Sequence, residues 1–192
     1  MFDFESIPDV HWHFDFDGTL FFTHVALLRA YEQAILENGG EFLTQAKEAM
    51  TRGESFRTFL KLCAWGDQEP DFDRIRDRKN ELYLSEVHLI QPNEPLIKIA
   101  LSLAPNISIV TSSNRVAVQG VLSAFNLLNA FKNIVSSDDV TNTKPNPEPY
   151  FKSKSPHPHA IHIAIEDSDL GITSAKEAGM LVLRVTDLRG MY

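Results

Sequence analysis

Short runs of β-branched and aliphatic residues alternate with helical patterns along much of this chain, and this alternation limits the folds open to it. Five such runs occupy residues 10–15, 106–112, 133–135, 160–167 and 181–185. Helical periodicity is found at residues 94–103, 115–125 and 168–178, and the last of these ends before Gly179. Short apolar strands that alternate with helices are typical of a parallel sheet covered by helices. We therefore predict an α/β fold.

One segment interrupts the alternation. About seventy residues after the first run, 21–91, carry helical periodicity and almost no strand signal, with helices expected at 25–40, 54–65 and 71–89. Such a block is too long for an ordinary connection between strands. We expect residues 1–20 and 92–192 to form a Rossmann-like α/β core domain, and residues 21–91 to form an inserted, all-helical cap domain.

Charge and cysteine content disfavour several classes of protein. The formal net charge of −8 at pH 7 disfavours non-specific nucleic-acid binding, which needs a basic face. The single cysteine, Cys63, cannot form an internal disulfide, which suits a reducing compartment. The first ten residues lack a signal-peptide pattern, and no window approaches the roughly 18 apolar residues of a membrane span. We expect a cytoplasmic protein without nucleic-acid or membrane partners.

Four carboxylates follow predicted strands at the same end. Asp15 ends the first run and Asp17 comes two residues later, while Glu166 and Asp167 end the fourth run. Ligand chemistry in open parallel sheets gathers at the carboxyl ends of the strands. We therefore expect these four side chains to lie close together.

Carboxylates gathered in this way need a compensating cation. Without one they repel one another, and at least one of them takes up a proton. Mg²⁺ removes the difficulty because it prefers oxygen ligands and retains bound waters. Lys144, after the third run, supplies a further positive charge, and the second run ends in the hydroxyl-bearing Thr111 and Ser112. The pattern predicts a magnesium site at this edge of the sheet.

Four stretches carry a resemblance to a known family. They are DFDGTL at residues 15–20, VTSSN at 110–114, TKPNPEPY at 143–150 and IEDSDLGITSAKEAGM at 165–180. In this order they resemble the four motifs of the haloacid dehalogenase superfamily. The subgroup they resemble most is the phosphatase and β-phosphoglucomutase-like one, which carries a helical cap after the first motif. The resemblance implies a Mg²⁺-dependent hydrolase of a small phosphorylated metabolite.

The resemblance also implies a role for each core residue. Asp15 would be the nucleophile that forms an aspartyl-phosphate, and Asp17 the general acid and base. Thr111 and Lys144 would contact the transferring phosphoryl group. Further phosphate contacts would come from Phe16, Gly18, Ser112 and Asn114. The metal would be bound by Asp15, Asp17 and Asp167, with Glu166 acting through water or Lys144.

Two stretches of the insert resemble substrate-reading elements of the subgroup. RGESF at residues 52–56 is similar to its G-x-S loop, and RKNELY at 78–83 to its lysine-bearing cap helix, so Arg52 and Lys79 are expected to contact substrate. Two other cap positions depart from the mutase pattern, since they hold Leu27 and Phe56 where the mutase has a histidine and an arginine. These departures favour hydrolysis over mutase activity.

Two alternatives to hydrolysis remain open. One is a phosphomutase of the β-phosphoglucomutase type. The other is a non-enzymatic phospho-acceptor signalling module, although Asp17 and the helical insert argue against it. We expect a monomer or weak homodimer. The remaining histidines near the strands are expected to be structural or surface residues: His11, His13, His157, His159 and His162.

Overall fold

The chain divides into two compact units, one formed by residues 1–20 and 92–192 and the other by residues 21–91. The computed structural model describes residues 9–52 and 54–186. Gly53 of the expected G-x-S loop, and most of the segment examined for a signal peptide, lie outside the described residues. Each unit is described by itself below.

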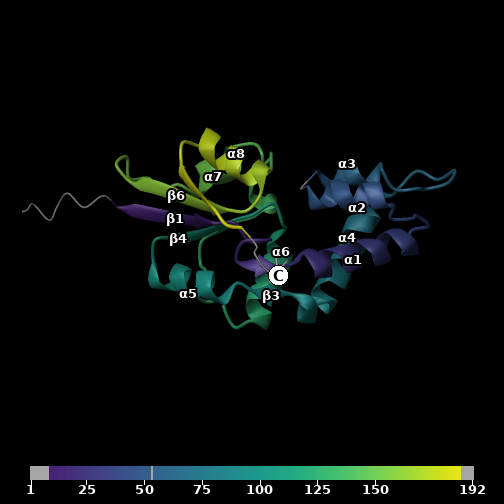
Figure 1. Ribbon diagram of the computed structural model, residues 1–192, viewed down its shortest axis with the longest axis horizontal. Coiled ribbons are helices and arrows are strands. Elements are labelled where there is room, and N and C mark those ends of the chain that lie inside the picture. The colour runs from purple at the N-terminus through teal and green to yellow at the C-terminus, as the bar shows by residue number, and fades with distance from the viewer. Residues whose placement is uncertain (1–8, 53, 187–192) are drawn as a thin grey trace, which may run out of the picture. The chain divides into compact units, whose positions relative to one another are not determined.

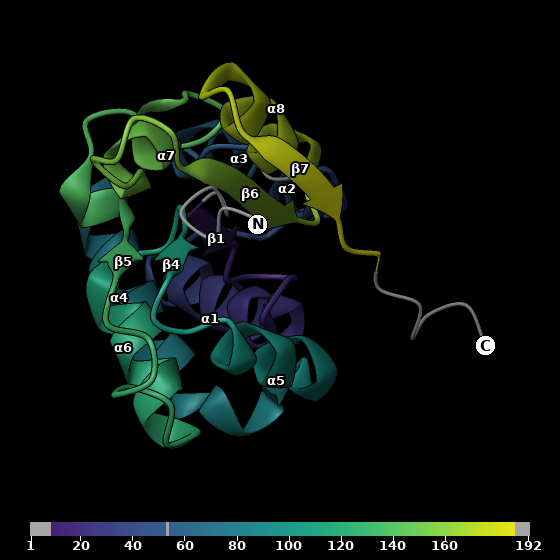
Figure 2. The ribbon, with the colours of Figure 1, turned by 90° about the vertical axis from the view of Figure 1, so that its left-hand side faces the viewer.

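A five-stranded parallel sheet forms the centre of the first unit. Its strands are β1 (Val10–Phe14), β4 (Ile107–Val110), β5 (Ile134–Val135), β6 (Ile161–Glu166) and β7 (Leu181–Arg184). Their order across the sheet is β5-β4-β1-β6-β7, which Figure 2 shows from one end, and every neighbouring pair is parallel. The five apolar runs thus each form a strand, and the predicted α/β fold is confirmed.

Helices cover both faces of this sheet. On one face lie α7 (Glu148–Ser153) and α8 (Asp169–Glu177), and on the other lie α5 (Glu94–Ser102) and α6 (Arg115–Ala124) (Figure 1). Ala164 of β6 packs against Tyr150 of α7 and Ala175 of α8. The side chain of the next residue, Ile165, and that of its register partner Phe14 on β1 point to the opposite face of the sheet. Helix α7 was not among the expected helices because its six residues are too few to show a helical period.

The second unit is helical, with α1 (His24–Glu37), α2 (Thr44–Thr51), α3 (Phe56–Leu60), α4 (Phe72–Ser85) and the short 3₁₀ helix η2 (Val87–Leu89). Its core includes Ile35, Phe59 and Ile75. Helix α2 was missed, and α3 is shorter than the expected helix at 54–65. Helix α3 ends at Leu60, whose carbonyl accepts a hydrogen bond from the indole nitrogen of Trp65 at 2.8 Å.

Two very short strands mark where the chain leaves the first unit and returns to it. They are β2 (Phe21–Phe22) and β3 (Gln91–Pro92), which pair with each other in a separate two-stranded sheet. Two residues are too few to give a strand pattern, so the sequence did not indicate them. Among the described residues, no helix has the length and apolar character to cross a membrane.

Two valines on α6 provide a test of the packing on one face of the sheet. Val118 is fully buried, whereas Val116 is 65% exposed. We expect Val118→Ala to lower the free energy of unfolding by about 2 kcal/mol, because it removes buried methyl groups and leaves a cavity. We expect Val116→Ala to change it by less than about 0.5 kcal/mol, because alanine is the better helix former. Urea unfolding measures both, and equal losses would contradict the assigned faces.

Candidate active site

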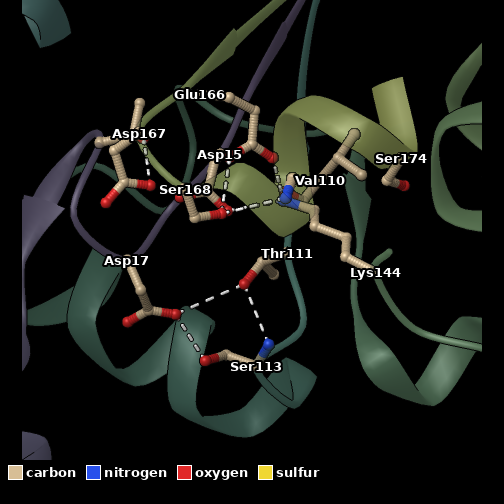
Figure 3. A network of polar contacts seen from close by, with 12 residues as sticks. Asp15, Asp17, Val110, Thr111, Ser113, Lys144, Glu166, Asp167, Ser168 and Ser174 are labelled. Atoms are coloured by element: carbon tan, nitrogen blue, oxygen red, sulfur yellow. Dashed lines mark hydrogen bonds and ion pairs between the residues drawn. The ribbon is translucent and has the colours of Figure 1, made fainter. Parts of the chain in front are cut away.

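The side chain of Lys144 joins the carboxyl ends of three neighbouring strands. Its Nζ donates to Oδ1 of Asp15 after β1 at 2.7 Å, to the carbonyl of Val110 in β4 at 2.7 Å, and to Oε1 of Glu166 in β6 at 2.6 Å (Figure 3). An ammonium group has three protons, and all three are used here. The predicted convergence of Asp15, Lys144 and Glu166 is therefore present in the structure.

The charges around Lys144 settle its protonation. Burial by itself lowers the pKa of Lys144, but the charges of Asp15 and Glu166 outweigh burial and raise that pKa well above its ordinary value. Lys144 is therefore a cation at neutral pH. For Asp15, burial raises the pKa well above its ordinary value, and Lys144 only partly offsets this because Glu166, Asp167 and Asp17 add negative charge. The site holds more negative charge than one lysine compensates.

Glu166 is fully buried and accepts a hydrogen bond from Lys144. Its Oε1 also accepts a hydrogen bond from the hydroxyl of Tyr150 at 2.5 Å. Burial raises the pKa of Tyr150 well above its ordinary value, so this hydroxyl keeps its proton and remains a donor. Gly171 makes room for the carboxylate, because a Cβ at that position would lie 2.0 Å from Oε2 of Glu166. The contact of Tyr150 was missed, since a tyrosine closing the TKPNPEPY stretch looks like any core aromatic.

Asp17 is held by hydroxyl groups from the loop after β4. Ser113 donates from Oγ to Oδ2 of Asp17 at 2.6 Å, and Thr111 lies at 3.5 Å from the same oxygen (Figure 3). Ser112 is exposed, and its expected phosphate contact remains a prediction. The contact of Ser113 with Asp17 was not expected from the sequence. Asn114 caps α6 by accepting a backbone amide of its first turn.

Asp167 lies against the turn that follows β1. Gly18 has φ of +87°, and a Cβ there would lie 2.1 Å from Oδ2 of Asp167, so only glycine fits on both counts. The hydroxyl of Thr19 donates to Oδ1 of Asp167 at 3.4 Å, and Phe16 is buried beneath the turn. Burial, followed by the charge of Glu166, raises the pKa of Asp167 to about 6.

The acidic residues suit a hard divalent cation. Asp15, Glu166 and Asp167 each offer an oxygen, and these three atoms lie within 4.8 Å of one another. Oδ2 of Asp15 is buried and has no hydrogen-bond partner among the described residues. Because Glu166 is already engaged by Lys144 and Tyr150, Asp15 and Asp167 are the better placed ligands, and a magnesium ion would satisfy the orphaned oxygen.

The two expected substrate contacts of the insert have different surroundings within the helical unit. Arg52 is exposed and forms an ion pair with Glu54 at 2.7 Å. Lys79 is only 8% exposed, and its Nζ lies 5.2 Å from the ring centroid of Tyr31. Both remain predictions as substrate contacts.

Comparison with known proteins assigns this arrangement to a family. The haloacid dehalogenase-like hydrolases match residues 13–185, a range that includes all the core side chains described above. The chain therefore belongs to the haloacid dehalogenase-like hydrolase family. The family expected from the four motifs is confirmed.

Individual members of the family show the extent of the similarity. The chain is 27% identical over 176 residues to a phosphoglycolate phosphatase of Cereibacter sphaeroides, covering 87% of this chain and 80% of that protein. It is 23% identical over 172 residues to the fructose-1-phosphate phosphatase YqaB of Escherichia coli, covering 87% and 91%. The crystal structure of CbbY from Rhodobacter sphaeroides in complex with phosphate superposes with a TM-score of 0.74 at 23% identity, covering 94% and 88%.

The raised pKa of Asp167 predicts a stability effect in the absence of metal. A carboxyl group whose folded pKa exceeds its unfolded value of 3.8 favours the folded state at low pH and loses that contribution as pH rises through about 6. At pH 8 in EDTA we therefore expect Asp167→Asn to raise the free energy of unfolding by roughly 1–2 kcal/mol, allowing for partial exposure. The difference from the wild type should shrink towards pH 4, and added Mg²⁺ should stabilise the wild type more than the variant.

Urea unfolding at several pH values measures this difference. The wild-type profile alone is not enough, because burial lowers the pKa of His13 to about 3, and His13 therefore loses its stabilising contribution as pH falls below its unfolded value. The difference between variant and wild type removes that contribution. Asp169→Asn, which removes a 90% exposed carboxylate, is the matched control and should not stabilise. If Asp167→Asn is no more stable than the wild type at pH 8 in EDTA, the ionised Asp167 is not destabilised by its burial and its acidic neighbours as predicted.

Proposed function

We propose that this protein is a magnesium-dependent phosphatase that hydrolyses a small phosphomonoester through an aspartyl-phosphate on Asp15. The observation that carries the proposal is the asymmetry of the Asp15 carboxylate. Its Oδ1 is bonded to Lys144, while its Oδ2 is buried and has no hydrogen-bond partner among the described residues. A carboxylate fixed through one oxygen and open at the other is suited to attack phosphorus.

The first half of the reaction follows from these positions. A carboxylate oxygen of Asp15 forms a bond to phosphorus while the bond from phosphorus to the leaving oxygen breaks. Asp17, two residues further on and held by Ser113, donates its proton to that leaving oxygen. Lys144 keeps its charge throughout and offsets negative charge that develops next to Asp15. Bound magnesium would supply further neutralisation of phosphoryl charge, held by Asp15 and Asp167.

The second half restores the enzyme. A water attacks phosphorus and gives its proton to the carboxylate of Asp17, and the bond between phosphorus and Asp15 breaks to release inorganic phosphate. Asp17 thus ends with the proton that it donated in the first half. Backbone amides of Phe16, Gly18 and Ser112 and the hydroxyl of Thr111 are proposed to hold the phosphoryl oxygens. Asn114 lies beside this loop as the cap of α6.

Hydrolysis is favoured over phosphoryl transfer to a second sugar hydroxyl. Phe56, where the mutase has an arginine, packs against the rings of Tyr31, Phe59 and Phe72, with centroids 5.9, 5.8 and 6.3 Å away. An aromatic side chain used in packing offers no cation for a second phosphate. We propose that the helical unit, residues 21–91, acts as the cap and that Arg52 and Lys79 contact the substrate.

The remaining proposals concern the setting of the protein. A cytoplasmic location suits the single cysteine, which is buried in the helical unit. We propose a monomer or weak homodimer and a small phosphorylated metabolite as substrate. The similarity to a phosphoglycolate phosphatase and to a fructose-1-phosphate phosphatase makes phosphoglycolate and hexose phosphates the first compounds to assay.

Replacement of Asp15 tests the proposed nucleophile. With MgCl₂, the wild type should release inorganic phosphate from at least one compound of a phosphomonoester panel, and EDTA should abolish the release. Asp15→Asn should lower kcat by at least about 10³-fold, because the amide is a poor nucleophile. Asp169→Asn makes the same change on the exposed surface and should retain activity. Phosphate release by Asp15→Asn at the wild-type rate would remove the assignment.

Replacement of Asp17 separates its acid and base roles. Asp17→Asn should slow turnover of an alkyl phosphate by about 10²–10⁴-fold, because neither proton transfer is assisted. With 4-nitrophenyl phosphate, whose leaving group needs little protonation, the first step should persist while hydrolysis of the intermediate fails. Rapid quenching with [³²P]-labelled substrate should then show a stoichiometric phosphoenzyme in this variant.

The same quench experiment decides between the alternatives. A wild-type phosphoenzyme that lasts for minutes with no phosphate release would favour a phospho-acceptor module. Conversion of one sugar-phosphate isomer into another, followed by ³¹P NMR and faster than phosphate release, would favour a mutase. Phosphate release from both variants at wild-type rates would exclude the proposed chemistry.

A further inference from the structure

Three imidazoles of the core unit take no part in the proposed chemistry. His11 and His13 lie on β1 and His162 lies on β6, and His11 and His162 are partners in the parallel register. The ring of His162 lies 5.5 Å from that of His11 and 5.2 Å from that of His13, centroid to centroid. His11 and His162 are in the first halves of their strands, whereas the catalytic carboxylates follow the carboxyl ends. Figure 2 looks onto the sheet end at which the chain enters β1.

A part-buried chain of hydrogen bonds orients the ring of His162. The hydroxyl of Ser153, at the end of α7, donates to the carbonyl of Tyr150 at 2.9 Å, so it accepts from Nδ1 of His13 at 2.9 Å. With Nδ1 protonated, neutral His13 accepts through Nε2 from Nδ1 of His162, also at 2.9 Å. His13 is fully buried. The assigned network thus leaves Nε2 of His162 facing a ligand, as an acceptor in the neutral ring and as a donor once the ring is protonated.

His162 lines a cavity of about 500 Å³ between the segment that follows α7 and the first residues of β6 and β7. Lys154 and His157 line the same cavity, and Pro156 and Leu181 supply apolar wall. None of the lining residues carries a carboxylate. The volume lies within the range of small-molecule sites, which combine apolar walls with a few polar groups.

Among the residues that the structure describes, the positive charge in this cavity has no counter-ion. Lys154 forms no ion pair within residues 9–52 and 54–186; its Nζ lies 5.3 Å from the ring centroid of Phe151. Burial, followed by the charge of Lys154, lowers the pKa of His162. The nearby carboxylate of Asp9 is engaged by His11 and by Asn106, each at 2.8 Å. In a chain of net charge −8, a cavity lined by cationic and imidazole groups is unusual.

The same geometry argues against a transition metal here. Histidine, cysteine and acidic donor atoms gather within 4.8 Å in groups of three or more only at Asp15, Glu166 and Asp167, as far as the described residues go. The ammonium group of Lys154 would also repel a cation beside His162. The same ammonium group would attract an anion.

We propose that this cavity is a binding site for a small organic anion, whose carboxylate or phosphate group is held by Lys154 and His162. Lys154 provides charge and three N–H donors. His162 would hold the anion as an imidazolium, donating from Nε2 while its Nδ1–H donates to His13. The apolar part of the ligand would lie against Pro156 and Leu181. The site is separate from the catalytic carboxylates, and the proposal holds whether or not the phosphatase chemistry is correct.

Histidine-ring NMR gives a local readout of binding. Two-bond ¹H–¹⁵N correlations of the untagged protein in EDTA would be followed during titration with succinate and, separately, with inorganic phosphate at constant ionic strength. The resonance of His162 is assigned by its loss in His162→Asn. We expect a saturable shift of the His162 and His157 rings in the millimolar range or below for at least one anion. Of succinate and phosphate, the anion that binds more tightly identifies the preferred head group.

Two lysines that lie two residues apart, Lys152 and Lys154, provide the variant and its control. Lys154→Met and Lys154→Gln should each weaken the anion at least 10-fold, because both remove the cavity's permanent charge. Lys152→Met removes an equal charge from a lysine that donates instead to the carbonyl of Asp139, and should leave the affinity within two-fold. Backbone spectra confirm that each variant is folded. A shift that never saturates, or that is equally weakened in Lys152→Met, would overturn the proposal.

Discussion

The buried ammonium group of Lys144 is the contact on which the catalytic end of the sheet depends. It touches the ends of β1, β4 and β6 through Asp15, Val110 and Glu166, so one nitrogen ties three neighbouring strands together. Without a buried cation, two carboxylates would face each other in a region with little water, which is far more costly than losing an exposed ion pair. Architecture and chemistry are thus coupled, because the group that holds the strand ends also orients the proposed nucleophile.

The carboxyl end of the sheet holds less positive than negative charge. One lysine faces Asp15, Asp17, Glu166 and Asp167, and the raised pKa values of Asp15 and Asp167 express that shortage. If the proposed function holds, this shortage of positive charge lowers stability but leaves charge and an open oxygen in place for a metal ion and a phosphoryl group. Gly18 and Gly171 leave room for two of these carboxylates, since a Cβ there would lie 2.1 Å from Oδ2 of Asp167 and 2.0 Å from Oε2 of Glu166.

Long elements and strand ends could be predicted from the sequence for clear physical reasons. Each apolar run is long enough to show its pattern, so the strands could be predicted. Parallel strands bring their carboxyl ends to one edge of the sheet, so the proximity of Asp15, Lys144, Glu166 and Asp167 could be predicted as well. The missed elements are short or lack a distinct pattern, as for β2, β3, α2 and α7. Two side-chain contacts were also missed, because neither the hydrogen bond of Ser113 to Asp17 nor that of Tyr150 to Glu166 leaves a periodic signal in the sequence.

The pairing of β2 with β3 has a consequence for how such a chain can diversify. The inserted segment begins and ends on hydrogen-bonded neighbours, so its two junctions are adjacent in space. A replacement of any length would close on the same two strands and leave the order β5-β4-β1-β6-β7 unbroken. Residues 21–91 can therefore be exchanged as one piece by recombination, while the sheet that carries Asp15 and Glu166 is inherited unchanged.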